Sequence, residues 1–347
     1  MSTIISKTVG IIGDGQLAQL MAHSAYQLGV NTLCFSKNDD CPAARVSPIF
    51  MGDLKDFEKQ VDVVTIENEN IDINTLENIT HLSPNIKSIA ISQDRLLEKK
   101  YFQECDIPTT IFFEINTADD LLLLKTRDKS RLYNGILKTR RFGYDGKGQL
   151  RITEKTNLNS AFETLNAPAI VEMFVEFDTE ISLLLARNKN GQTVYFPLIE
   201  NMHENGILRT SHFFSHEKIE SIARQAHDYG KRLADSLDYV GVLAIEFFLK
   251  NNQLIANEMA PRVHNSGHLT IEGCNVSQFE LHCRAILDLP LIQPIITHHV
   301  EMINIIGEWP KQINNAIHIY NYGKTPRENR KLGHYILSKK SDKLFRC

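Results

Sequence analysis

Two glutamates interrupt otherwise apolar runs in the last third of the chain. Glu246 lies within GVLAIEFFLK, and Glu258 lies within LIANEMA, beyond the polar residues 251–253. A carboxylate in an apolar run is costly unless it is paired or bound to a cation. If residues 251–253 form a hairpin loop, the two carboxylates are directly opposite and repel each other unless a divalent cation or a shared proton holds them. We predict that both bind Mg²⁺, which prefers oxygen ligands; the alternative is that one glutamate faces solvent.

Residues 137–149, LKTRRFGYDGKGQ, combine cations with glycines. Glycines let the backbone approach phosphates closely, and lysine and arginine neutralise a polyphosphate. A basic hairpin turn in solvent is the alternative, but the apolar residues ahead of Lys138 favour a strand that presents this lysine inward. We therefore predict a polyphosphate site next to the carboxylate pair.

Residues 172–180, EMFVEFDTE, fit an adenine pocket lined by Glu172, Phe174 and Val175. Backbone groups would read the base edge, apolar side chains would enclose the base, and Glu180 would accept a ribose hydroxyl. A plain core strand is the alternative interpretation.

Two further polar segments are candidates for substrate contacts. Residues 262–268, RVHNSGH, follow a buried strand, as active-site loops often do. His264 and His268 raise the alternative of zinc, but no third soft ligand lies nearby. Residues 322–334, YGKTPRENRKLGH, are rich in cations and fit a phosphate clamp; ordinary solvated charge is the alternative.

Gly10, Gly13 and Gly15 lie around the end of the first predicted strand. Exposed amides at a helix start form an anion site, and the spacing approaches the dinucleotide fingerprint Gly-x-Gly-x-x-Gly. Ala18 occupies the third position, however, so a tight turn after a parallel strand is an equal alternative.

The elements that position these residues follow from hydrophobic periodicity. Residues 16–28 have helical spacing, and short β-branched or apolar runs at 9–13, 31–36, 61–67 and 86–92 predict strands. Strands that alternate with helices indicate a parallel sheet, so the first 93 residues predict a doubly wound domain.

Longer apolar runs begin at residue 169 and predict a larger, mostly antiparallel sheet. Helices are expected at 94–105, 117–126 and 216–238, and a strand–turn–strand unit at 240–259. A smaller unit begins after residue 291, so the 347 residues predict two or three domains of α/β type.

Composition excludes several classes of protein. A net charge of −4 argues against a general nucleic-acid binder, and no uncharged apolar stretch is long enough to span a membrane. The N-terminus lacks a signal-peptide pattern. None of the six cysteines forms a Cys-x-x-Cys pair, which predicts reduced structural thiols and a cytoplasmic protein.

Taken together, these segments resemble the ATP-grasp superfamily and, within it, the 5-(carboxyamino)imidazole ribonucleotide synthases. The resemblance rests on GDGQLAQLMA, TIENENI, LKTRRFGYDGKGQ, EISLLLARN, NEMAPRVHNSGH, TIEG, SQFELHCRAI and RKLGH, which run through nearly the whole chain. It implies an N-terminal Rossmann-like domain (1–93), an ATP-grasp domain (94–290) with a small lid (about 107–170), and a C-terminal substrate-closing domain (291–347).

The resemblance also implies a reaction. ATP would phosphorylate bicarbonate, and the carboxyphosphate, or the carbon dioxide it releases, would be captured by the exocyclic amine of aminoimidazole ribonucleotide. Mg²⁺ would be the metal cofactor, the enzyme would be a homodimer, and a separate carboxymutase would act on the product. Neither nucleic acid nor membrane would be a partner.

Carried over residue by residue, the resemblance implies three groups of contacts. ATP would be held by Arg95, Lys138, Gly143, Tyr144, Asp145, Gly146, Lys147, Gly148, Gln149, Glu172, Met173, Phe174, Val175, Glu180, His203, Asn257 and Glu258. The second substrate would be held by Gln16, Leu17, Glu69, Tyr144, Asn265, His268, Lys324, Arg330 and Lys331. The catalytic groups would be Asp145, Lys147, His268 and Lys324.

The chain departs from the family pattern at Asp14, Ala18 and Gln19. An acid near a ribose phosphate would repel it, so Asp14 either points away or weakens substrate binding. Other ATP-grasp ligases, a nucleotide-binding subunit without turnover, and a dinucleotide-dependent oxidoreductase are the alternatives. The pair Glu246 and Glu258 with Lys138 argues against the second, and the missing third glycine argues against the third.

Overall fold

The structure is a computed structural model that describes residues 7–143 and 147–339. Its N-terminal domain is a parallel four-stranded sheet in the order β3-β2-β1-β4, which confirms the predicted doubly wound domain. Its strands and helices are β1 (Thr8–Ile12), α1 (Gln16–Gln27), β2 (Asn31–Phe35), η1 (Pro42–Arg45), β3 (Ile49–Phe50), α2 (Leu54–Glu58), β4 (Val63–Ile66) and α3 (Ile73–Leu76).

Residues 86–92 form a helix, α4 (Ile86–Ser92), so the predicted strand there is wrong. Asn85 caps this helix, because its side-chain oxygen accepts hydrogen bonds from the backbone and hydroxyl of Ser88. Ile89 is fully buried in the apolar cluster below the parallel sheet. The cap and this burial outweigh the β propensity of the isoleucines.

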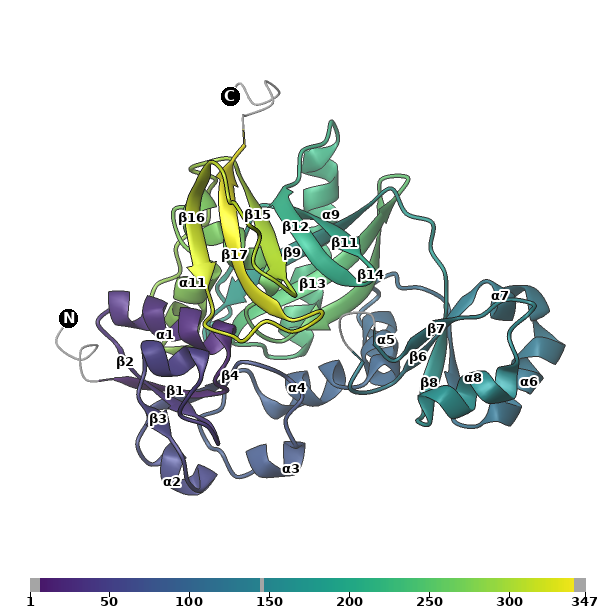
Figure 1. The fold of residues 1–347 in the computed structure, drawn as a ribbon, viewed down its shortest axis with the longest axis horizontal. Coiled ribbons are helices and arrows are strands. Elements are labelled where there is room, and N and C mark those ends of the chain that lie inside the picture. Colours follow the sequence, from purple (N-terminus) through teal and green to yellow (C-terminus); the bar gives the residue numbers. More distant parts are fainter. Residues whose placement is uncertain (1–6, 144–146, 340–347) are drawn as a thin grey trace.

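A small antiparallel sheet in the order β5-β8-β6-β7 projects to one side of the molecule as a lid (Figure 1). Helix α5 (Arg95–Glu104) leads into it, and a capping box of Thr117 and Asp120 starts its first helix. Leu121, Leu132 and Leu137 form part of its separate core. The lid contains β5 (Phe112–Ile115), α6 (Ala118–Arg127), α7 (Lys129–Tyr133), β6 (Gly135–Thr139), β7 (Gln149–Arg151), α8 (Leu158–Leu165) and β8 (Ala169–Met173).

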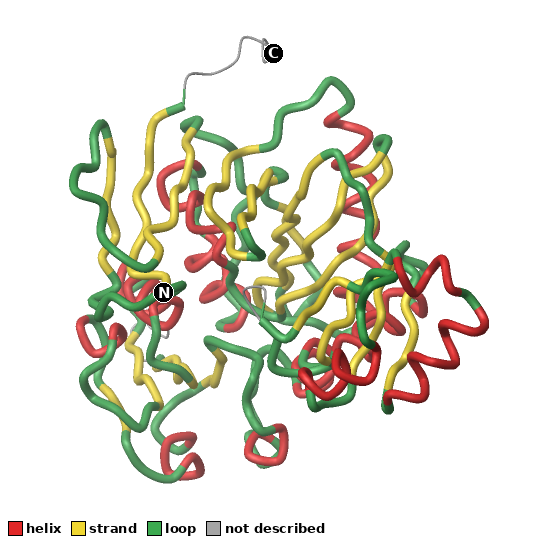
Figure 2. Tube along the Cα trace, turned by 45° about the vertical axis from the view of Figure 1, so that its right-hand side comes forward, coloured by secondary structure: helices red, strands yellow, loops and turns green. Residues whose placement is uncertain are grey.

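The largest sheet has nine strands in the order β14-β13-β9-β11-β12-β15-β17-β16, with β10 paired to β9. Figure 2 shows the strands of the molecule in yellow. Helix α9 packs on one face and α11 on the other, because alternate residues of β9 and β13 face opposite clusters. Its elements are β9 (Thr179–Arg187), β10 (Thr193–Tyr195), β11 (Ile199–Glu204), β12 (Ile207–Phe213), α9 (Ile219–Ser236), β13 (Gly241–Lys250), β14 (Gln253–Ala260), η2 (Asn265–Leu269), α10 (Thr270–Gly273), α11 (Gln278–Ile286), β15 (Val300–Ile306), β16 (Ala316–Asn321) and β17 (Lys331–Ser338).

The strands predicted to form a separate C-terminal unit extend this sheet. β15 pairs antiparallel with β12 through residues such as Ser211 and Met302, and β17 then pairs with β15. The predicted domain boundaries remain predictions, although the sheet continues across the one at residue 291.

One buried histidine joins the N-terminal domain to the large sheet. His282 on α11 accepts a hydrogen bond at Nδ1 from the backbone N–H of Val242 on β13 (3.0 Å). Its Nε2 lies 2.8 Å from the hydroxyl of Thr65 on β4. Since Nδ1 accepts, Nε2 carries the proton and donates to Thr65. Within the described ranges, no helix combines the length and the apolar character that crossing a membrane requires.

Candidate active site

A cavity of about 1370 Å³ lies between the N-terminal domain, the lid and the large sheet. Most predicted site residues within the described ranges line it: Gln16, Leu17, Glu69, Arg95, Lys138, Gly143, Lys147, Gln149, Glu172, Met173, Phe174, Val175, Glu180, His203, Glu246, Asn257, Glu258, Asn265, Lys324, Arg330 and Lys331. Gly148 and His268 are not among the lining residues. Tyr144, Asp145 and Gly146 lie outside the described residues.

The two glutamates of the predicted metal site pair across adjacent strands. Glu246 on β13 is opposite Glu258 on β14, as the sequence predicts. The hairpin loop is residues 251–252 rather than 251–253, and both loop residues have positive φ. A two-residue loop alone would pair Glu246 with Asn257, but a β-bulge shifts the register by one residue. The bulge therefore brings Glu258 opposite Glu246 and leaves Asn257 as the extra residue.

Burial and like charge set the electrostatics of this pair. Loss of water, and then the charge of Glu258, raise the pKa of Glu246 to about 7. A divalent cation shared by both carboxylates would relieve both effects, so these residues fit Mg²⁺. Among the residues that the structure describes, no three His, Cys, Asp or Glu side chains are grouped to hold a metal. Two carboxylates suit an ion whose other ligands are phosphate and water oxygens, and do not suit a closed zinc site.

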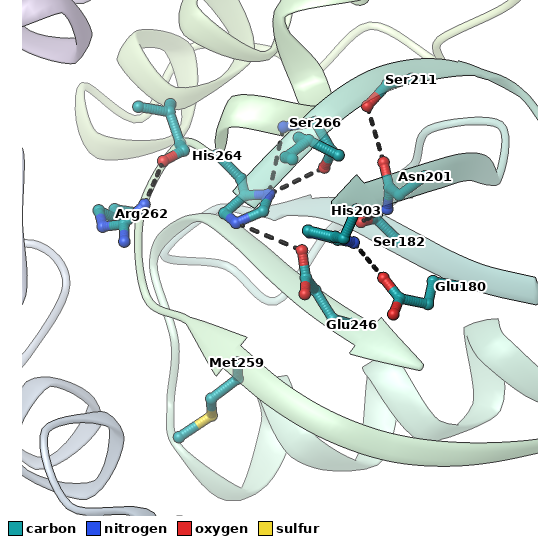
Figure 3. A network of polar contacts seen from close by, with 12 residues as sticks. Glu180, Ser182, Asn201, His203, Ser211, Glu246, Met259, Arg262, His264 and Ser266 are labelled. Atoms are coloured by element: carbon teal, nitrogen blue, oxygen red, sulfur yellow. Dashed lines mark hydrogen bonds and ion pairs between the residues drawn. The ribbon is translucent and has the colours of Figure 1, made fainter. Parts of the chain in front are cut away.

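Polar side chains from several strands lie around Glu246 (Figure 3). His203 on β11 forms an ion pair through Nδ1 with Glu180 on β9, and His264 Nε2 lies 3.6 Å from Glu246 Oε1. Burial lowers the pKa of His203, but Glu180 and the neighbouring carboxylates outweigh it and raise the value to about 8. His203 is therefore largely protonated at pH 7 and balances part of the acidic charge.

Glu172, expected beside adenine, is held by two lysines. Its carboxylate lies 2.7 Å from Lys138 Nζ and 3.5 Å from Lys99 Nζ. Burial alone would raise the pKa of Glu172, but the two ammonium groups lower it to about 2. Phe174 stays 40% exposed, and the Arg151 guanidinium lies 4.0 Å from its ring centroid. Sequence reasoning missed Lys99, because an ordinary helix pattern gives no sign that it points inward.

Arg95 holds the start of the glycine-rich loop. Its guanidinium donates to the backbone carbonyls of Thr139 (3.0 Å) and Gly143 (2.9 Å). The preceding Asp94 forms a bidentate pair with Arg140. The start of α5 therefore sets the position of the strand and loop that present Lys138.

The glycine turn before α1 holds a carboxylate of the chain itself. Glu67, just after β4, accepts hydrogen bonds from the backbone N–H groups of Gly15 (2.6 Å) and Leu17 (3.1 Å). A Cβ at Gly13, where φ is positive, would lie 2.4 Å from Glu67 Cβ, so this position requires glycine. A Cβ at Gly15 would lie 2.3 Å from Glu67 Oε1 and would displace the carboxylate. The predicted anion site at the helix start is thus filled by Glu67, which also disfavours a dinucleotide pyrophosphate there. Glu67 lies in the TIENENI motif, but its role was missed.

Two cations contact α1 and the segment after β4, at the end of the cavity away from the lid. Lys324 donates to the side-chain oxygen of Gln16, and Arg262 forms a bidentate pair with Glu69 at 2.5 and 3.1 Å. Asp14, the acid at an unusual position, accepts from the Ser36 hydroxyl at 2.5 Å and does not line the cavity. Of the two expectations for Asp14, the structure supports the one in which it points away.

His268 lies behind the cavity. Its side chain is fully buried, with ring centroids 5.5 Å from Phe279 and 4.9 Å from His334. Burial lowers the pKa of His268 to about 3, so the ring is neutral at pH 7. The turn η2 directs Asn265 to the cavity and His268 inward. His268 therefore packs between η2 and β17 and does not line the cavity, and its catalytic and substrate contacts remain predictions.

Three family models match consecutive parts of the chain. The ribonucleotide synthetase preATP-grasp domain matches residues 6–93, the ATP-grasp domain matches residues 100–279, and the phosphoribosylaminoimidazole carboxylase C-terminal domain matches residues 301–346.

The N5-carboxyaminoimidazole ribonucleotide synthase of Pseudomonas aeruginosa is 38% identical, over 95% of this chain and 94% of that relative. The chain belongs to the N5-carboxyaminoimidazole ribonucleotide synthase family. A crystal structure of the family member from Thermus thermophilus is 38% identical, with a TM-score of 0.88 over 95% of this chain and 93% of that one.

An Aspergillus clavatus N5-carboxyaminoimidazole synthase in complex with ADP and 5-aminoimidazole ribonucleotide is 28% identical, with a TM-score of 0.86. The match covers 97% of this chain and 95% of that structure. These comparisons confirm the expected ATP-grasp fold and the synthase family, whose members are ATP-dependent ligases.

Proposed function

We propose that this chain uses ATP to carboxylate 5-aminoimidazole ribonucleotide with bicarbonate, in purine biosynthesis. The products are N5-carboxyaminoimidazole ribonucleotide, ADP and phosphate. One observation carries the proposal: a single cavity joins the paired carboxylates of Glu246 and Glu258 to the cations Lys324 and Arg330. A phosphoryl donor and a phosphate-bearing acceptor therefore fit into the same space.

ATP binds at the lid end of the cavity in this proposal. Lys138 and Arg95 neutralise its phosphates, and Glu180 accepts from the ribose. When bound between Glu246 and Glu258, Mg²⁺ would neutralise charge on the transferring phosphoryl group. A bicarbonate oxygen attacks the γ-phosphorus and ADP leaves, which gives carboxyphosphate.

5-Aminoimidazole ribonucleotide binds between α1 and the C-terminal strands. In this proposal its phosphate is bound by Lys324, Arg330 and Lys331, and its other groups by Gln16 and Glu69, all of which line the cavity. The exocyclic amine attacks the carbonyl carbon of carboxyphosphate, or the carbon dioxide formed from it, and inorganic phosphate leaves. Carboxyphosphate is short-lived in water, so the site must exclude water during turnover.

Phosphate release tests this function. Purified protein should release phosphate from ATP only with bicarbonate and Mg²⁺, and release should rise with 5-aminoimidazole ribonucleotide. Glu258→Gln should fold but lose turnover, because one metal ligand loses its charge. Faster release with a different amine or amino acid would instead indicate another ATP-grasp ligase.

Three further proposals follow from the family resemblance: a homodimer, a cytoplasmic location and a separate carboxymutase that consumes the product. Light scattering of the purified chain tests the first, since a monomer at assay concentration would contradict it. The carbamate product is unstable in water, so an enzyme that consumes it should raise the yield of the downstream carboxylate.

A further inference from the structure

Two neighbouring side chains of α5 bind the backbone on both sides of Glu258. β14 is the edge strand of the large sheet, and beyond Ala256 it has no neighbouring strand on its outer side within the described residues. There Lys99 Nζ donates to the carbonyl of Asn257 at 2.5 Å. Glu98 Oε1 accepts from the backbone N–H of Met259 at 2.6 Å. These two backbone groups, which lie beside the bulge on the open edge of β14, therefore find their partners on one helix.

These two side chains are deeply buried. Lys99 is 1% exposed and Glu98 is 3% exposed. A charge at this depth is costly unless it is paired, and burial raises the pKa of Glu98 to about 8. Lys99 is paired with Glu172, which also binds Lys138 at the nucleotide end of the cavity. Lys99 thus connects the bulge to the lid strand that carries Glu172, although it does not itself line the cavity.

We infer that Lys99 and Glu98 are positioning residues for the metal ligand Glu258, because they fix the β-bulge that sets its carboxylate opposite Glu246. The inference rests on the proposed function, in which these carboxylates share Mg²⁺. Without the bulge, a two-residue loop pairs Glu246 with Asn257, and the carboxylate of Glu258 leaves its place. The metal site therefore depends on a helix that supplies no ligand to it.

Lys99→Met tests the inference, since it removes the donor to Asn257 and keeps a similar volume. Calorimetry would measure the affinity for ADP with Mg²⁺ and with EDTA, and the ratio of the two affinities reports the metal contribution. We expect this ratio to fall about tenfold in Lys99→Met, which corresponds to ~1.4 kcal/mol. A merely structural role would weaken ADP binding equally with and without Mg²⁺ and leave the ratio unchanged.

Two matched controls lie next to the positioning residues. Lys100→Met removes the adjacent, half-exposed lysine, which pairs with Glu114. Thr109→Val removes the hydroxyl that donates to the carbonyl of Ala256 at 2.7 Å, just before the bulge. Both variants should keep the wild-type ratio.

Glu98→Leu is the second variant, because it removes the acceptor of the Met259 N–H and leaves both ion pairs of Glu172 intact. It should lower the ratio in the same direction as Lys99→Met. A wild-type ratio in both variants would overturn the inference. A ratio near one in the wild-type protein, or an unchanged ratio in Glu258→Gln, would overturn the metal site of the proposed function and the inference with it.

Discussion

Mild acid should destabilise this protein through His282, and His282→Gln should remove that part of the effect. The imidazole is fully buried and uses both nitrogens, one toward Val242 and one toward Thr65. Protonation of Nδ1 would break the bond from Val242 and place a charge in the interior. Glutamine carries a donor and an acceptor but no titratable group, so it is the suitable replacement.

The magnitude follows from the two pKa values of the ring. Burial lowers the pKa of His282 in the folded state to about 4, against about 6.5 in an unfolded chain. Between pH 6.5 and pH 4, His282 is therefore protonated in the unfolded state and neutral in the folded state. Stability is complete above pH ~6.5 and is lost as the pH falls from there toward 4. At pH 5 the unfolded ring gains about 2 kcal/mol from its proton, while the folded ring stays neutral.

Urea unfolding at pH 7.5 and pH 5.0 measures this loss. The fall in unfolding free energy between the two pH values should be about 2 kcal/mol smaller in His282→Gln than in the wild-type protein. His23→Gln is the matched control, because His23 is exposed on α1 and should not change the difference. An equal loss in wild-type and His282→Gln protein would refute the reasoning.

Two further predictions concern carboxylates at the acceptor end of the cavity. Gly15→Ala places a Cβ 2.3 Å from Glu67, so it should displace this carboxylate from the start of α1. The unfolding free energy measured in urea should fall by about 1.5–3 kcal/mol. An unchanged unfolding free energy would contradict the contact. Arg262→Met leaves Glu69 unpaired and should cost about 3–5 kcal/mol in the same measurement. The double variant Arg262→Met/Glu69→Gln should recover part of the loss, and no recovery would argue against the pair.

The β13–β14 hairpin shows how far the sequence alone can go. Alternating apolar residues and a polar turn were enough to predict the two strands and the opposition of Glu246 and Glu258. The loop was assigned one residue too long, and the bulge at Asn257 makes up the difference. That bulge is held by Lys99, which lies 158 residues earlier in the chain, so no local pattern could reveal it.

Other differences have the same origin in tertiary packing. Residues 86–92 have the β-branched composition of a strand, but the Asn85 cap and the buried face of α4 decide for a helix. Asn265, which follows a buried strand, lines the cavity, as expected for an active-site loop. The side chain of His268, only three residues later, points inward because β17 packs against η2. This long-range packing cannot be predicted from the local sequence.

The pairing of β12 with β15 has a consequence for how such enzymes diverge. The carboxylate-bearing hairpin and the cation-bearing C-terminal strands belong to one hydrogen-bonded sheet. A chain cut before β15 would leave β12 with open amides and carbonyls that invite self-assembly. The C-terminal strands β15–β17 therefore cannot be exchanged between relatives as an independent unit. A preference for a new acceptor substrate has to arise by side-chain replacement, with the hydrogen bonds between β12 and β15 kept.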